Sequence, residues 1–339
     1  MVDLHGSLGG AVLMELNLID DIHVADRSDL ETAYDCPQKF AYEQGQIRIP
    51  SRAAEVGNQG HAAISATIEA FIREGLSKRD IAEFLKREVL ATRTDLLPDT
   101  WEAMWPSMWK IAELLSCHRP GDVERFDGGQ GAYSGQLAKD ISVGGETVRV
   151  TSELDLLLAT VSEDVFLEVD WKTGHTPYDI DHIKKSFQFR LHAALVFDTY
   201  PACNVLRVQV LRTQYKDLSP PVKFHRDELP VLEAEIQGAA ARWLDVKNRS
   251  KPDKPLITDR FATAEKCRRC QGARQCWKSR VETTPAELVD LLTIIEAVQD
   301  QVQDELKAIC GKNGEVEGTC GQKFGTKKPK TERASYALY

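Results

Sequence analysis

Two acidic residues on neighbouring predicted strands limit how this chain can fold. Asp155 lies in one apolar run, and Asp170 lies in the next, two residues before Lys172. Side chains of a strand alternate between its two faces, so Asp170 and Lys172 project from one face and Trp171 projects from the other. Only a short turn at 162–164 separates the runs. Antiparallel pairing can therefore bring the two carboxylates into one small site.

These side chains predict a metal site for phosphodiester hydrolysis. Two carboxylates on one face repel each other and are costly to bury, and a hard divalent cation such as Mg²⁺ or Mn²⁺ removes both costs. Lys172 beside such a cation can orient water or stabilise charge on a phosphate. The alternative is an ion pair at a strand end, in which Lys172 saturates Asp170. Glu153 and Glu168 share faces with the two aspartates and have no assigned role.

The pattern around the acidic runs predicts an α+β, or mixed α/β, core with a helical addition on its N-terminal side. Helical periodicity comes first, strand-like runs follow from 134 to 170, and a helix, a strand and a further helix complete the core. The expected helices are 28–44, with an interruption at Pro37, and 53–74, 77–92, 100–115, 181–199 and 227–247. Three tryptophans in 100–115 are expected to form a buried anchoring face.

Composition excludes some classes of protein. The net charge of −9 is not the signature of a protein that binds DNA mainly by bulk charge. A basic patch remains in the tail, at Lys323, Lys327, Lys328, Lys330 and Arg333, where the alternative is a solvated terminus. No apolar run is long enough for a membrane span, and no signal peptide is apparent. We expect a cytoplasmic protein without membrane contact.

The acidic runs resemble the metal motifs of RecB-like PD-(D/E)XK nucleases. "SELDLLL" looks like the first motif and "FLEVDWKTG" like the second. The resemblance implies a restriction-endonuclease-like core sheet flanked by helices, with Mg²⁺ or Mn²⁺ bound by Asp155, Asp170 and the main-chain carbonyl of Trp171. Lys172 would position the water. "VGNQGHAAI" supplies His61, which matches the metal-binding histidine of an early helix in this family.

A helix after the second motif also resembles the family. Family members carry Gln-x-x-x-Tyr there, and this chain has "QFRLHAAL", with Gln188 and then His192 at the tyrosine position. Gln188 is expected to support the site or the strand being cut. His192 departs from the pattern, so contact with phosphate and a buried helix histidine are both open. Three cations, Lys184, Lys185 and Arg190, are candidate phosphate contacts or solvated charges.

Eight cysteines raise the question of a second metal site, because a cytosolic chain does not hold them as disulfides. Three of them lie within ten residues, in the pattern Cys267-x2-Cys270-x5-Cys276. Zinc and 4Fe–4S sites both take four soft ligands, so this triplet lacks one thiolate. Spacing alone does not distinguish the two sites. The other cysteines, Cys117, Cys203, Cys310 and Cys320, are interpreted as structural.

The fourth thiolate is suggested by the segment "YDCPQKFAYE", which resembles the N-terminal Cys-Pro segment of iron–sulfur nucleases in the RecB-like group, including the AddB nuclease domain and CRISPR-adaptation exonucleases. The resemblance implies that Cys36, Cys267, Cys270 and Cys276 hold a 4Fe–4S cluster, with zinc as the alternative. Such a cluster would join the ends of the nuclease domain and close a long loop.

The sequence thus predicts a metal-dependent DNA exonuclease that acts on single strands or DNA ends, in recombination, repair, phage DNA processing or CRISPR adaptation. The alternatives are a non-catalytic nucleic-acid-binding or assembly subunit and an iron–sulfur electron carrier. We expect an N-terminal segment over 1–27, a nuclease domain over 28–280, and a C-terminal helix and basic tail over 281–339. Helix 285–310 either packs on the core or docks a protein partner or second copy.

Overall fold

A computed structural model of the chain describes residues 22–43, 51–123, 135–160, 162, 164–250, 270, 295–296, 299–308, 316–317, 323–327 and 335–338. The chain divides into two compact units, which are described separately. The first comprises Met1–Glu31 and Ile47–Leu244, and the second comprises Thr32–Gln46 and Asp245–Tyr339. Among the described residues, no helix is both long and apolar enough to cross a membrane.

Runs of helices and runs of strands follow one another along the chain, as expected of an α+β protein. The helices are α1 (Arg27–Asp35), α2 (Pro37–Glu43), α3 (Arg52–Glu74), α4 (Lys78–Leu90), α5 (Leu97–Met104), α6 (Met108–Ser116), α7 (Ile180–Lys185), α8 (Phe187–Thr199) and α9 (Leu229–Arg249). The strands are β1 (Ile22–Asp26), β2 (Gly135–Val143), β3 (Glu146–Leu154), β4 (Leu157–Ala159), β5 (Val165–Lys172), β6 (Val205–Arg212), β7 (Asp217–Leu218), β8 (Val222–His225), β9 (Val316–Glu317), β10 (Lys323–Lys327) and β11 (Ser335–Leu338). The predicted fold class is confirmed.

Two sheets form the centre of the first unit. One has the order β1-β3-β2, and the other has the order β4-β5-β6-β7, with β8 also paired to β6. Strands β5 and β6 are parallel, whereas β4 runs antiparallel to β5 with Leu157 opposite Glu168. The β2–β3 hairpin turns through Gly144 and Gly145, whose φ angles of 58° and 92° favour glycine.

The first acidic segment differs from its predicted form. The sequence predicts that Asp155 lies inside one strand-like run, but β3 ends at Leu154, and β4 begins at Leu157 in the other sheet. Asp155 therefore lies in the short link between two sheets. The antiparallel partner of β5 is β4, and Val169 donates its main-chain N–H to the carbonyl of Leu156 at 3.0 Å. This contact holds the link beside β5.

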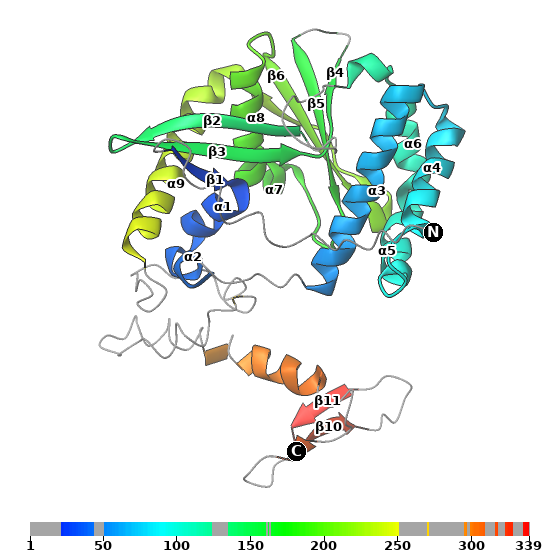
Figure 1. Cartoon of the computed structure of the whole chain (residues 1–339), viewed down its shortest axis with the longest axis vertical. Coiled ribbons are helices and arrows are strands. Elements are labelled where there is room, and N and C mark those ends of the chain that lie inside the picture. Colours follow the sequence, from blue (N-terminus) through cyan, green and yellow to red (C-terminus); the bar gives the residue numbers. More distant parts are fainter. Residues whose placement is uncertain are drawn as a thin grey trace, which may run out of the picture. The chain divides into compact units, whose positions relative to one another are not determined.

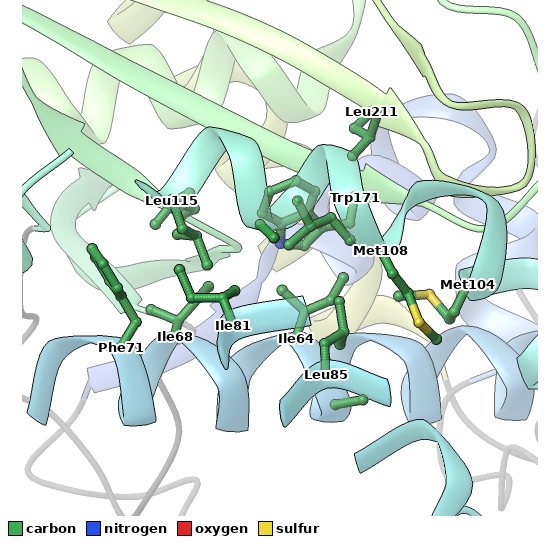
Figure 2. Close-up of a cluster of buried hydrophobic side chains, with 14 of the residues drawn as sticks. Ile64, Ile68, Phe71, Ile81, Leu85, Met104, Met108, Leu115, Trp171 and Leu211 are labelled. Atoms are coloured by element: carbon green, nitrogen blue, oxygen red, sulfur yellow. The ribbon is translucent and has the colours of Figure 1, made fainter. Parts of the chain in front are cut away.

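A layer of helices covers one face of β5 and β6 (Figure 1). Three apolar residues of α3 recur at helical spacing and are at most 3% exposed, namely Ile64, Ile68 and Phe71. Trp171 of β5 and Leu211 of β6 enter the same cluster from the sheet side. Figure 2 shows these side chains packed between the helices and the strands. The buried indole of Trp171 thus fixes the strand that carries Asp170.

Helix 100–115 was predicted as one element but is interrupted. Helix α5 ends at Met104, a 3₁₀ turn spans Trp105–Ser107, and α6 starts at Met108. Proline at 106 lacks the N–H that a continuous helix requires. The prediction that the tryptophans form a buried face is wrong, because Trp105 and Trp109 are 48% and 52% exposed.

Helices α7 and α8 replace the single predicted helix 181–199, with a break at Ser186. Helix α8 contacts β2, β3 and β6. Its side chains also bind Asp170 and Glu168, which lie on the face of β5 opposite Trp171. In Figure 1, α8 lies behind these strands, and α3 to α6 lie together at the other side of the sheet. Strand β5 therefore has helices on both faces.

The second unit contains the antiparallel sheet β11-β10-β9, which pairs Phe324 with Leu338 and with Val316. Residues 295–296 and 299–308 are helical, within the predicted helix 285–310. The remainder of that helix lies outside the described residues, as do Cys267 and Cys276.

Candidate active site

Three elements meet at Asp155. His61 of α3 places Nδ1 3.0 Å from Asp155 Oδ1, and the main-chain N–H of Trp171 donates to Asp155 Oδ2 at 2.8 Å. The side chain of Asp155 is only 15% exposed, and that of His61 is 36% exposed. The link between β3 and β4 thus brings its carboxylate to both the early helix and the strand of Asp170.

A second set of contacts surrounds Asp170 on β5. Gln188 of α8 donates Nε2 to Asp170 Oδ1 at 2.7 Å, and Lys172 Nζ lies 2.9 Å from Asp170 Oδ2. Lys172 Nζ also donates to Gln188 Oε1 at 3.3 Å. The amide of Gln188 therefore bridges the carboxylate and the ammonium. As predicted from strand alternation, Asp170 and Lys172 share a face of β5.

Two glycines let α3 lie close to α5 and to Thr173, the residue after β5. A Cβ atom at Gly60 would lie 2.9 Å from Met104 Sδ, and one at Gly57 would lie 3.2 Å from Thr173 Oγ1. Both distances are shorter than an ordinary van der Waals contact, so a larger residue at either position would require Met104 or Thr173 to move. Because Gly60 directly precedes His61, this close approach holds the imidazole beside Asp155.

These residues line one cavity of about 550 Å³. Helix α3 contributes one wall, and α1, β3, β5 and α8 contribute the rest. The lining residues are Arg27, Asn58, His61, Ala62, Ser65, Ala66, Glu69, Glu153, Asp155, Asp170, Lys172 and Gln188. Sequence reasoning missed Arg27, the first residue of α1, since no motif or periodicity distinguishes it there. Glu153, which had no assigned role, opens onto this cavity.

Mutual contacts fix the charges of the site. Burial acts to lower the pKa of Lys172, but the carboxylates of Asp170 and Asp155 outweigh it, and the net pKa is above the ordinary value. Burial acts to raise the pKa of Asp155, yet the hydrogen bond from His61 and nearby positive charge bring it below its usual range. At neutral pH, Lys172 is therefore a cation and Asp155 an anion. In this charge state, Lys172 can donate hydrogen bonds.

His192 is buried, one of the two possibilities that the sequence left open. Its Nδ1 lies 2.5 Å from Glu168 Oε1, and its Nε2 lies 2.9 Å from Ser152 Oγ. All three side chains are at most 3% exposed. Burial raises the pKa of Glu168, although His192 acts against this shift. His192 therefore cannot reach a substrate phosphate from this position.

The three cations considered as phosphate contacts do not line the cavity. Lys184 pairs with Glu228 at 2.8 Å, and Arg190 pairs with Glu235 at 2.5 Å. Lys185 forms a pair with Asp181 at 3.2 Å in an exposed setting. Each of these side chains pairs with a carboxylate that does not line the cavity, so Arg27 is the better placed candidate for a phosphate contact.

The donor atoms of the cavity fit a hard divalent cation. Asp155 and Asp170 offer carboxylate oxygens and His61 offers an imidazole nitrogen, which are ligand types that Mg²⁺ and Mn²⁺ accept. Asp170 Oδ2 is buried without a well-aligned hydrogen bond, although Lys172 Nζ is close enough for an ion pair. In the described part of the chain, no three His, Cys, Asp or Glu side chains already form a metal-binding group. Here the carboxylates pair instead with His61 and Lys172.

The predicted cluster cysteines are only partly described. Cys36 lies between α1 and α2 and is half-buried, and Cys270 is 8% exposed. The other cysteines differ in setting, because Cys117 is exposed whereas burial raises the pKa of Cys203 to about 11. A thiol with that pKa is an inert part of the core at neutral pH.

Comparison with known proteins supports one family. No curated protein matches the chain. A solved structure titled "Crystal structure of SSO0001" aligns with 11% identity over 76% of this chain and 87% of the other, with a TM-score of 0.34. The model of the PD-(D/E)XK nuclease superfamily matches residues 27–277. Because this match spans well over half of the chain and every residue of the candidate site, the chain belongs to the PD-(D/E)XK nuclease superfamily.

Proposed function

We propose that this chain is a metal-dependent DNA exonuclease of the RecB-like group, acting on single strands or DNA ends. One observation supports the proposal: five polar side chains meet around one cavity, although they come from two helices, one strand and the link between β3 and β4. They are His61, Asp155, Asp170, Lys172 and Gln188. Recombination, repair, phage DNA processing and CRISPR adaptation are the processes that such an activity would serve.

Each residue has a role that follows from its contacts. His61, Asp155 and Asp170, with the main-chain carbonyl of Trp171, would hold Mg²⁺ or Mn²⁺. When bound, the cation would polarise the phosphoryl oxygen and lower the pKa of a water. Lys172, a cation at neutral pH, would donate hydrogen bonds to the attacking water or the phosphate. Gln188 would keep the Asp170 carboxylate and the Lys172 ammonium in place.

The size of the cavity favours a single strand. About 550 Å³ is in the range of a site for a small ligand, which suits one nucleotide and its phosphate rather than a duplex. Single strands and frayed ends are the forms of DNA that can enter such a site. This supports exonuclease action over cleavage within a duplex.

The iron–sulfur cluster is part of the same proposal. The segment Thr32–Gln46, which carries Cys36, belongs to the same compact unit as Asp245–Tyr339, which carries Cys267, Cys270 and Cys276. A shared unit supports ligation of one cluster by these four thiolates, with zinc as the alternative. The division at 28–280, a docking role for helix 285–310 and a cytoplasmic location also remain proposals.

Digestion of labelled DNA by protein purified without oxygen tests the activity. We expect linear single strands to be degraded with Mn²⁺ and to survive with chelator, whereas circular single strands should resist because they have no ends. Label at the 5′ or the 3′ end gives the polarity. Rapid cutting of circles would replace the exonuclease proposal with an endonuclease. Intact DNA in every reaction would favour a non-catalytic binding subunit.

Arg27→Ala is expected to raise KM for single-stranded DNA about tenfold with little change in kcat. Arg27 lines the cavity with its side chain partly exposed, and Glu31 on the same helix pairs with it at 3.0 Å. Loss of one charge-assisted hydrogen bond to a phosphate costs about 1.5 kcal/mol, which is about tenfold. Steady-state kinetics would measure the effect. Arg149→Ala is the control, because Arg149 pairs with Asp140 outside the cavity; equal KM values for the two variants would exclude a role for Arg27.

A further inference from the structure

Polar contacts join strand β5 and helix α8 in two places, at the cavity and behind it. At the cavity, Gln188 Nε2 donates to Asp170 Oδ1 at 2.7 Å. Behind it, His192 Nδ1 lies 2.5 Å from Glu168 Oε1. The proposed mechanism uses the first contact and leaves the second without a role.

The spacing of the two contacts is set by the two kinds of backbone. Gln188 and His192 are four residues apart on a helix, which is a rise of about 6 Å. Glu168 and Asp170 are two residues apart on a strand, which is a rise of about 6.6 Å. Because the two rises nearly match, a contact between His192 and Glu168 places Gln188 opposite Asp170. A shift of α8 by one residue, about 1.5 Å, would break both contacts.

His192, which forms the contact behind the cavity, also reaches the segment that carries Asp155. His192 Nε2 is 2.9 Å from Ser152 Oγ on β3, and Asp155 follows Ser152 by three residues. The imidazole thus joins β3, β5 and α8, and each of these elements leads directly to Asp155, Asp170 or Gln188. A single buried side chain links three of the elements that line the cavity.

Stability alone is a poor explanation for this network. Ser152, His192 and Glu168 are 3%, 0% and 0% exposed, so the charged or polar groups lose their hydration. One oxygen, Glu168 Oε2, has no hydrogen-bond partner. Apolar side chains of similar volume often stabilise such a position as well or better. A directional contact, unlike apolar packing, does fix the register of the helix on the strand.

We propose that Glu168, His192 and Ser152 are positioning residues that set the register of α8 against β5 and β3 and thereby aim the Gln188 amide at Asp170. The inference rests on the proposed nuclease function only for its kinetic consequence. The placement of Gln188 can be measured whether or not the protein cuts DNA.

A fully apolar replacement separates position from stability. The triple variant Ser152→Ala, Glu168→Leu, His192→Leu removes all three polar groups together, so no partner remains buried and unpaired. We expect a melting temperature close to that of the wild type, a kcat lower by about 10- to 100-fold and weaker Mn²⁺ binding in calorimetry, as when an outer-shell partner of a metal ligand is lost. A stable triple variant with wild-type kcat and Mn²⁺ affinity would overturn the proposal.

Two further measurements keep the test decisive. The side-chain amide signal of Gln188, assigned with Gln188→Ala in ¹⁵N-glutamine-labelled protein, should move towards the position of a solvated amide in the triple variant. An unmoved signal would refute the positioning role of Glu168, His192 and Ser152, whether or not the wild type cleaves DNA. Absence of cleavage by the wild type would reject the nuclease proposal separately. If the triple variant does not fold, Ser152→Ala serves instead, with an expected loss of about threefold in kcat and a shifted Gln188 signal; wild-type values for both would overturn the proposal.

Discussion

Asp170→Asn is expected to lower kcat/KM on single-stranded DNA by about 10³-fold or more. The substitution keeps the shape of the side chain, and the amide oxygen can still accept from Gln188, which donates to Asp170 Oδ1 at 2.7 Å. It removes the negative charge that would hold the cation and balance Lys172. Loss of cation-based charge stabilisation is worth several kcal/mol, or about three powers of ten in rate.

The same substitution elsewhere provides the control. Asp140 on β2 pairs with Arg149 in an exposed setting and does not line the cavity. Asp140→Asn should therefore keep kcat/KM within about twofold. Its effect on the free energy of unfolding should also be small, because an exposed ion pair contributes about 0–1 kcal/mol to stability. Initial rates with end-labelled DNA and saturating Mn²⁺ would be compared, together with melting curves. A folded Asp170→Asn protein that cuts at the wild-type rate would show that the cavity is not the active site.

The arrangement of the acidic strands could be predicted because it depends on local rules. Alternation along β5 places Asp170 and Lys172 together and sends Trp171 to the opposite face, and the structure has this arrangement. The link at Asp155 was harder to predict, because strand propensity does not reveal that β3 and β4 belong to different sheets. The carboxylate still reaches β5, since the main chain of Trp171 binds it.

Features that depend on long-range packing were not predictable. Glu168 and His192 are 24 positions apart, and only the docking of α8 on β5 makes them partners. Arg27 lines the cavity because α1 begins beside it, which no local pattern reveals. The abundance of tryptophan in 100–115 suggested a buried face, yet Pro106 interrupts the helix, and Trp109 is 52% exposed. Periodicity predicts an amphipathic face but not how the chain continues after a break.

Trp171→Ala is expected to lower the free energy of unfolding by about 3–5 kcal/mol. Trp171 is 1% exposed and packs with Ile64 and Leu211 between the helical layer and β5 and β6, as Figure 2 shows. Removal of a fully buried indole loses its transfer free energy and leaves a cavity that the surrounding helices fill only in part. The substitution also loosens the strand between Asp170 and Lys172, so a fall in activity should accompany the loss of stability.

Urea unfolding in metal-free buffer would measure this change without a contribution from bound cation. Trp109→Ala is the matched control, since it removes the same atoms from a side chain that is 52% exposed. It should change the free energy of unfolding by no more than about 0.5 kcal/mol, as expected for a surface substitution. If the two variants were equally stable, Trp171 would not anchor the strand. In that case, the packing of β5 on α3 to α6 would not hold Asp170 in place. The contacts of β5 with α8 would have to do so alone.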